Sequence, residues 1–121
     1  MIQIQTIDHV QILAPTGSEG EIRHFYGGVL GLEEVEKPPE LQPRGGVWYR
    51  VGEVVLHIGV EPEPPDPGRR HFAFRVADVA EARAVLEAAD VRTGEAPTVA
   101  GMPRFYGWDP FGNQIEFMNY E

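Results

Sequence analysis

Residues 104–118 have the sequence RFYGWDPFGNQIEFM and predict the β-hairpin around which the fold is organised. Its central residues, Asp109-Pro110-Phe111-Gly112, are typical of a type I turn, because proline presets φ at the second position and glycine suits the fourth. In the strand that follows, the side chains alternate between two faces, with Gln114, Glu116 and Met118 on one and Ile115 and Phe117 on the other. Glu116 therefore lies either on a solvated sheet face or inside a site, and the hairpin alone favours the solvated face.

The first half of the chain predicts a strand, a helix and three further strands. Ser18, with Glu21 three residues later, predicts a capping box at the start of a helix that Gly31 ends. The strands are expected at residues 4–13, 32–36, 47–51 and 54–60, the last two joined by a two-residue turn at Gly52-Glu53.

A proline-rich linker, residues 61–69, separates this half from a second half with the same order of elements. Asp78 and Glu81 predict a second capping box, and the strands are expected at residues 71–76, at 91–93 and in the final hairpin. The repeat predicts an α+β fold of two βαβββ modules, about 4–60 and about 70–120, within a single domain of residues 1–121. Two such modules side by side would form a curved mixed sheet around a cleft.

The net charge of −9 at pH 7 limits the classes of partner. It argues against nucleic acid and anionic membrane surfaces, because the long-range field of the protein would repel both. The absence of cysteine excludes disulfides, a thiolate nucleophile and a Cys-ligated zinc ion. No apolar run is long enough to span a bilayer and the N-terminus lacks the features of a signal peptide, so a cytoplasmic protein is expected.

The repeat places four side chains of metal-binding type at equivalent positions. His9 and His71 lie on the first strand of their halves, and His57 and Glu116 lie on the last strand. Strand alternation predicts that all four face the cleft. Imidazole nitrogen and carboxylate oxygen suit a divalent Fe, Mn, Ni, Co or Zn ion. Each histidine alone is more typical of a hydrogen-bonded core residue, whereas the four together favour a metal site.

Two arginines and two aromatic residues are candidates for binding a small-molecule substrate. Arg75 shares a face with His71, and Arg104 begins the final hairpin, so each either binds an anionic group or forms a surface salt bridge. Trp48 and Tyr106 lie on strands around the predicted cleft, where an aromatic ring either joins the core or stacks on a substrate.

Several segments together show a family resemblance over nearly the whole chain: Ile7-Asp8-His9-Val10, Phe25-Tyr26, Leu30-Gly31-Leu32, residues 56–61, residues 71–74, Arg104-Phe105-Tyr106 and residues 109–116. In these segments the chain resembles the vicinal oxygen chelate superfamily, which includes glyoxalase I, extradiol dioxygenases, fosfomycin-resistance enzymes and bleomycin-resistance proteins. The resemblance implies paired βαβββ modules, a homodimer, and a metal cleft with ligands at His9, His71 and Glu116. Glyoxalase I carries glutamate at the position of His57, so the role of His57 stays open.

These observations lead us to expect a metal-dependent enzyme that acts on a small, oxygen-rich molecule chelated to the ion through adjacent oxygens. The ion would act as a Lewis acid while Glu116 or a bound hydroxide moves protons, in chemistry of the lyase, isomerase or dioxygenase type. The alternative is a metal-free protein of the bleomycin-resistance type that sequesters a ligand. A third option is a metal-bearing domain without turnover. The chain looks most similar to small glyoxalase-like proteins.

Overall fold

Each half of the chain forms a four-stranded sheet in the computed structural model, which describes all 121 residues. The sheets belong to two units, Met1–Pro64 (unit 1) and Pro65–Glu121 (unit 2). Both units combine a mixed sheet with helical segments, which confirms the predicted α+β fold class. None of the helices has the length and apolar composition needed to cross a membrane.

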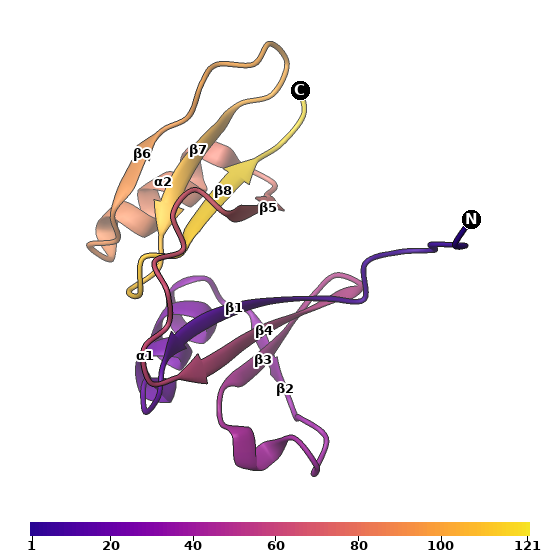
Figure 1. Cartoon of the computed structure of the whole chain (residues 1–121). Helices are drawn as coiled ribbons and strands as arrows, with labels where there is room; N and C mark the ends of the chain where they lie inside the picture. The colour runs from indigo at the N-terminus through magenta and orange to yellow at the C-terminus, as the bar shows by residue number, and fades with distance from the viewer. The chain divides into compact units, whose positions relative to one another are not determined.

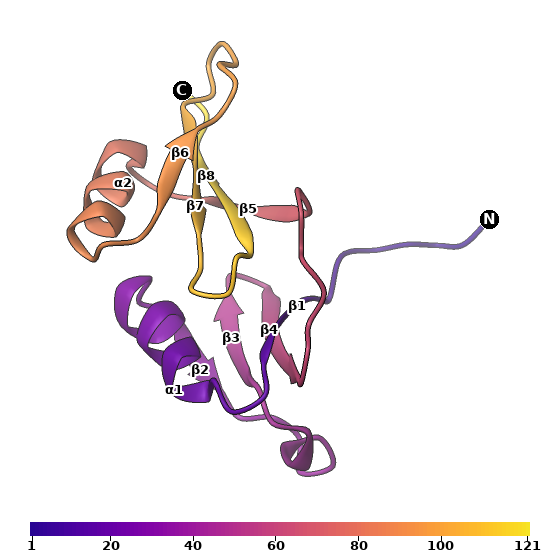
Figure 2. The same ribbon diagram turned by 60° about the vertical axis from the view of Figure 1, so that its left-hand side comes forward.

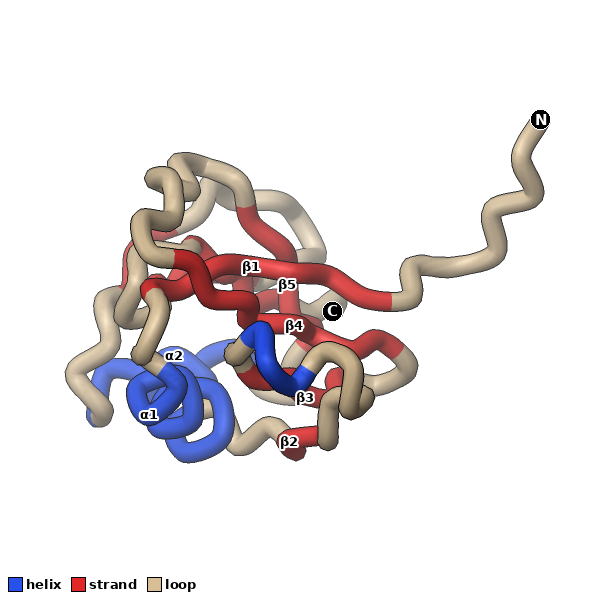
Figure 3. Tube along the Cα trace, turned by 60° about the horizontal axis from the view of Figure 1, so that its bottom comes forward, coloured by secondary structure: helices blue, strands red, loops and turns tan.

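In unit 1 the strands lie in the order β1-β4-β3-β2, with β1 parallel to β4 and the other neighbours antiparallel (Figure 1). Figure 3 shows the short 3-10 turn η2 in the loop that connects β2 to β3. The elements are, in chain order, β1 His9–Pro15, α1 Glu19–Ile22, η1 Arg23–Val29, β2 Glu33–Val35, η2 Gln42–Arg44, β3 Val47–Val51 and β4 Val54–Glu61.

Unit 2 repeats this arrangement with the strand order β5-β8-β7-β6, and β5 is parallel to β8. Helix α2 packs against the sheet of its own unit (Figure 2). The elements are β5 His71–Arg75, α2 Val79–Ala88, β6 Thr93–Glu95, β7 Arg104–Trp108 and β8 Gln114–Met118. The identical strand order in the two units confirms the internal repeat predicted from the sequence.

The predicted first strand starts too early. It was expected from residue 4, whereas β1 begins at His9. Its partner β4 begins only at Val54, so residues 1–7 have no neighbouring strand to pair with, and only the carbonyl of Asp8 still accepts the N–H of Val55. The side chains of Ile2 and Ile4 accordingly remain exposed.

Other strand ends also differ from the predictions: β1 continues to Pro15, β2 is limited to Glu33–Val35, and β5 ends at Arg75. The edge strand expected at residues 91–93 lies at Thr93–Glu95, because the N–H of Val91 still bonds to the carbonyl of Leu86 at the end of α2. Strand β4 continues to Glu61, a residue that was assigned to the linker.

The capping box predicted at Ser18 and Glu21 is wrong. The Ser18 hydroxyl makes no capping bond and donates to the carbonyl of Pro15. The neighbouring Glu19 carboxylate instead accepts a hydrogen bond from the N–H of Gly46, at 3.0 Å, and this bond lowers the pKa of Glu19. Helix α1 is therefore tied to the loop before β3.

The other predicted helix ends agree with the structure. Asp78 Oδ1 accepts the N–H of Glu81 at 3.0 Å and caps α2. Gly31, with φ of +74°, follows the last turn of the first helical segment, where the N–H of Leu30 bonds to the carbonyl of Phe25.

The final hairpin forms as predicted. The N–H of Gly112 donates to the carbonyl of Asp109, and Asp109 Oδ1 accepts the N–H groups of Phe111 and Asn113 at 2.9 and 2.8 Å. Glu116 on β8 is only 8% exposed. The solvated-face alternative for Glu116 is therefore wrong.

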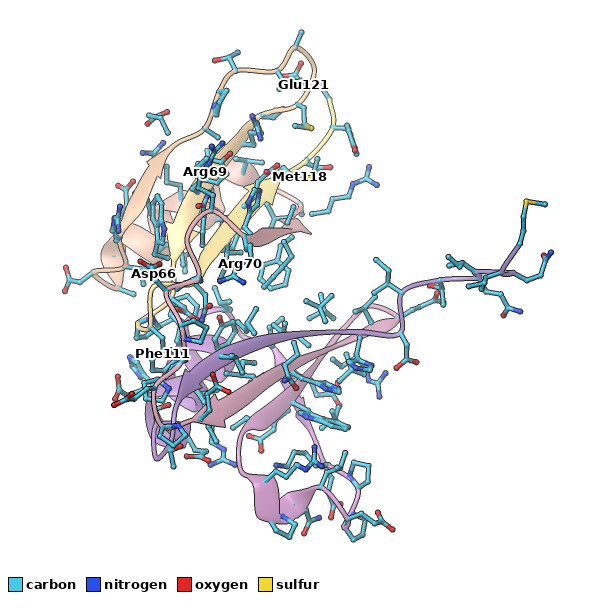
Figure 4. All side chains as sticks on the ribbon, viewed as in Figure 1. Asp66, Arg69, Arg70, Phe111, Met118 and Glu121 are labelled. Atoms are coloured by element: carbon cyan, nitrogen blue, oxygen red, sulfur yellow. The ribbon has the colours of Figure 1, made fainter.

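The part of the linker that follows β4 has hydrogen bonds of its own although it contains no strand or helix. The N–H of Gly68 donates to Asp66 Oδ1 at 2.8 Å, and Arg70 Nη2 donates to the carbonyl of Asp66 at 2.9 Å (Figure 4). Since prolines lack a backbone donor, polar side chains supply the bonds that shape this segment.

The core of unit 1 contains one polar atom without a partner. Tyr49 on β3 is 1% exposed and its ring centroid lies 6.0 Å from that of Tyr26. The Tyr49 hydroxyl is buried and makes no hydrogen bond. Burial raises the pKa of Tyr49, so the hydroxyl is neutral at physiological pH.

Tyr49→Phe is therefore expected to leave the free energy of unfolding unchanged or to raise it by about 1 kcal/mol, because it removes an unsatisfied buried hydroxyl. Urea unfolding of both proteins, followed by circular dichroism, measures the difference. A loss of stability beyond about 1 kcal/mol would mean that the hydroxyl has a bonding partner in solution.

Candidate functional site

Three parallel rings are stacked on one face of the unit 1 sheet. His57 on β4 lies between Trp48 on β3, at 3.7 Å between ring centroids, and His9 on β1, at 4.3 Å. The interplanar angles are 4° and 9°. The stack forms because His57 has Trp48 directly opposite on the antiparallel strand, while His9 is its diagonal neighbour on the parallel strand.

His57 is held without hydrogen bonds. It is 8% exposed and no atom of the chain bonds to its ring nitrogens. Burial lowers the pKa of His57, the nearby His9 lowers it further, and Asp8 partly offsets both effects. The imidazole is therefore neutral at physiological pH, which is the form that binds metal ions.

His9 has one ring nitrogen engaged and one available. Its Nδ1 lies 2.9 Å from Oδ2 of Asp8. A carboxylate only accepts hydrogen bonds, so this geometry assigns the proton to Nδ1. In the neutral ring the Nε2 lone pair is then available to a ligand or a metal ion. Asp8 was not predicted as a partner of His9, because strand alternation placed the two side chains on opposite faces. Asp8 in fact precedes β1, where alternation does not apply.

His71 has the same arrangement in unit 2. Its Nδ1 lies 2.9 Å from the carbonyl oxygen of Arg69, so Nδ1 donates and the Nε2 lone pair is left available. That Nε2 lies 3.3 Å from Oε1 of Glu116. In the neutral ring both atoms are acceptors, and two acceptors facing each other suit a shared proton or a bound cation.

Arg104 holds the Glu116 carboxylate. Its Nη1 donates to Oε1 of Glu116 at 3.1 Å, and its Nε donates to the carbonyl of Pro97 at 3.0 Å. Both side chains of the ion pair are largely buried. Oε2 of Glu116 has no partner within the chain. The sequence left Arg104 open between binding an anionic group and forming a surface salt bridge, and the structure engages it in a largely buried ion pair with Glu116.

The two pairs of side chains are equivalent by strand register. On the parallel neighbour, His9 lies opposite Val55, two residues before His57. His71 lies opposite Gln114, two residues before Glu116. The aromatic candidates are equivalent as well, since Trp48 lies opposite His57 and Tyr106 lies opposite Glu116. The repeat therefore extends to the positions of the candidate site residues.

The remaining candidates are placed as follows. Tyr106 contacts His71 edge-on, with ring centroids 5.5 Å apart. Arg75 donates to Asn119 Oδ1 at 3.0 Å and lies over the ring of Tyr120. Within either unit, no three His, Asp or Glu side chains are grouped so as to hold a metal ion. The structure thus brings His9 to His57 and His71 to Glu116.

A groove of about 540 Å³ lies on the face of unit 1 that carries the ring stack (the unit 1 groove). His9, Trp48 and His57 line it together with Gln11 from β1 and with Lys37 and Arg44 from the loop before β3. No function was predicted for Gln11, Lys37 or Arg44. Their one signal is that two cations fall in the loop that leads into the strand of Trp48.

Comparison with known proteins identifies relatives of the whole chain. A family model described as the Glyoxalase/Bleomycin resistance protein/Dioxygenase superfamily matches residues 6–117. The crystal structure of a glyoxalase family protein from Bacillus anthracis is 43% identical, and the match covers 100% of this chain and 99% of that one with a TM-score of 0.94. No match was found among functionally curated proteins.

More distant structures share the fold. Lactoylglutathione lyase from Agrobacterium tumefaciens is 24% identical, with a TM-score of 0.71 over 98% of this chain and 99% of that chain. The fosfomycin resistance protein FosX from Listeria monocytogenes is 16% identical, with a TM-score of 0.79 over 98% of this chain and 96% of that chain.

Proposed function

The chain belongs to the Glyoxalase/Bleomycin resistance protein/Dioxygenase superfamily, and from this premise we propose that it is a metal-dependent enzyme acting on a small molecule with adjacent oxygen atoms. The observation that carries the proposal is the hydrogen bonding of His9 and His71. In both rings Nδ1 is committed to an oxygen acceptor, which leaves Nε2 available. Metal-binding histidines commonly have such a partner, because it fixes the tautomer and the ring orientation.

The donor chemistry of the chain fits a divalent transition metal. The proposed ligands are His9, His57, His71 and Glu116. All three imidazoles can supply a neutral nitrogen, and Glu116 supplies the unpartnered oxygen Oε2. An ion bound there would polarise the adjacent oxygens of a substrate as a Lewis acid. Zn, Ni, Fe, Mn and Co are the candidate ions.

Glu116 is the residue to which we assign proton transfer. Arg104 fixes its Oε1, so Oε2 is the oxygen free to accept a proton from a substrate. The low exposure of Glu116 excludes most bulk water from this oxygen. Trp48 and Tyr106, opposite His57 and Glu116 on neighbouring strands, supply aromatic surface beside the proposed ligands. Chemistry of the lyase, isomerase or dioxygenase type is compatible with these roles.

Sequestration of a ligand without metal, as expected for a bleomycin-resistance type of protein, is the second candidate. The observation in its favour is the unit 1 groove, whose ring stack offers a flat aromatic surface to a ligand. The two candidate functions differ in whether the proposed metal ligands are needed for ligand binding. A homodimer stays a prediction for both.

Metal titration tests the proposal. Metal-depleted, untagged protein is expected to bind a single Zn, Ni, Mn or Fe(II) ion per chain, measured by calorimetry and elemental analysis. His57→Ala is expected to weaken the affinity about tenfold if His57 is a ligand. Equal affinity in wild type and His57→Ala would leave three ligands. If none of the four ions binds stoichiometrically, the proposal of a metal-dependent enzyme is contradicted and ligand sequestration is favoured.

A further inference from the structure

The unit 1 groove contains hydrogen-bond donors that lack acceptors. Arg44 makes no ion pair or hydrogen bond through its side chain, and neither does the amide of Gln11. Lys37 donates only to the backbone carbonyl of Gly45. Elsewhere in the chain arginines such as Arg23 and Arg83 pair with carboxylates. Arg44 and Gln11 therefore keep their donors available to a ligand in the groove.

The two cations of the groove lie at the same end of it. Lys37 bonds to Gly45, the residue that follows Arg44. The loop at Gly45 is packed against Val60 of β4, because a Cβ added at Gly45 would lie 3.0 Å from Val60 Cγ2. Val60 is three residues from His57, which corresponds to about 10 Å along a strand. The groove therefore has a cationic end and, about 10 Å away, the aromatic end at the ring stack.

Carboxylates in and beside the groove offset only part of this charge. Asp8 is bonded to His9 at the aromatic end. Glu61, the last residue of β4, also lines the groove and does not form an ion pair with Lys37 or Arg44. Outside the groove lining, the Glu19 carboxylate lies against Gly45 and Lys37 lowers its pKa, so Glu19 offsets the charge of Lys37. Arg44 is then the groove cation that no carboxylate contacts, and it is the primary anchor for an anion.

We propose that the unit 1 groove binds an organic anion, with its carboxylate, phosphate or phosphonate group at Arg44 and Lys37 and its planar or apolar part against Trp48. The inference rests on the proposed function only in taking this anion as the substrate of the enzyme. Gln11 lies between the two ends, since a Cβ at Gly59 would be 3.2 Å from its amide. Its amide can bond to polar atoms in the middle of the ligand.

Phenylphosphonate is a suitable probe because it joins a planar ring to a dianion. We expect it to shift the indole N–H signal of Trp48, and not that of Trp108 in unit 2, in NMR spectra of the metal-free protein. Arg44→Gln should weaken binding about fivefold, Arg44→Lys should weaken it less, and Glu61→Gln should tighten it. Arg50→Gln is the matched control, because Arg50 is an exposed cation of the same unit that does not line the groove.

Two further measurements separate this inference from the proposed function. Benzamide, which has the ring without the charge, should bind more weakly than phenylphosphonate, and added salt should reduce the difference. His71→Ala, which removes a proposed metal ligand, should leave probe binding unchanged. An unshifted Trp48 signal, or equal affinity in wild type and Arg44→Gln, would overturn the inference while leaving the metal titration valid.

Discussion

Replacing Gly46 with alanine is expected to destabilise unit 1 by roughly 3–5 kcal/mol, summing left-handed backbone strain, a steric clash and a lost charged hydrogen bond. Gly46 has a φ of +84°, and an added Cβ would overlap the carbonyl oxygen of Ile58. Backbone on the central strand β4 cannot yield as a flexible side chain can. Relief of the clash would move the Gly46 N–H away from Glu19, which holds the loop to α1.

Gly52→Ala is the matched control for this prediction. Gly52 also has a positive φ, +59°, but an added Cβ there meets no atom within 4 Å. Its substitution should cost only about 1–2 kcal/mol of backbone strain. Chemical denaturation followed by circular dichroism compares the two variants with wild type. If Gly46→Ala unfolds no earlier than Gly52→Ala, the close approach of Gly46 to β4 is not present in solution.

The alternation and repeat of the sequence were sufficient to predict which histidine shares a sheet face with His57 and which shares one with Glu116. The two-residue period of strands predicted that His9 shares a sheet face with His57, and His71 with Glu116. Side chains on paired strands lie on a common face once the register of the strands is fixed. The repeat also reversed the initial preference for a solvated Glu116. That preference came from the average exposure of glutamate, which says nothing about one particular strand face.

The partners of these residues were not predictable in the same way. Asp8 bonds to His9 from just before β1, where strand alternation does not apply. Arg104 reaches Glu116 diagonally across two strands, and only the register of β7 on β8 determines that contact. The position of Arg44 depends on the loop geometry at Gly45 and Gly46, whose positive φ values are not encoded in any periodic pattern.

Substituting both His9 and His71 by alanine is expected to reduce metal affinity by more than about 1,000-fold, since altering even a single group around a ligand costs about 10- to 100-fold. Both side chains are exposed enough for the fold to tolerate the change. The stack on Trp48 still holds His57 in the variant, and Arg104 still holds Glu116. A loss of binding would therefore report on ligation and not on unfolding, which thermal denaturation of the same samples verifies.

His24→Ala controls for the removal of a histidine as such, because His24 is an exposed residue of η1. It should leave both the affinity and the stoichiometry of metal binding unchanged. The single variants then rank the ligands: His71, which faces Glu116 at 3.3 Å, should contribute more than His9, whose side chain is half exposed and stacked on His57. If wild type and the double variant bind metal equally well, or equally little, His9 and His71 are not metal ligands.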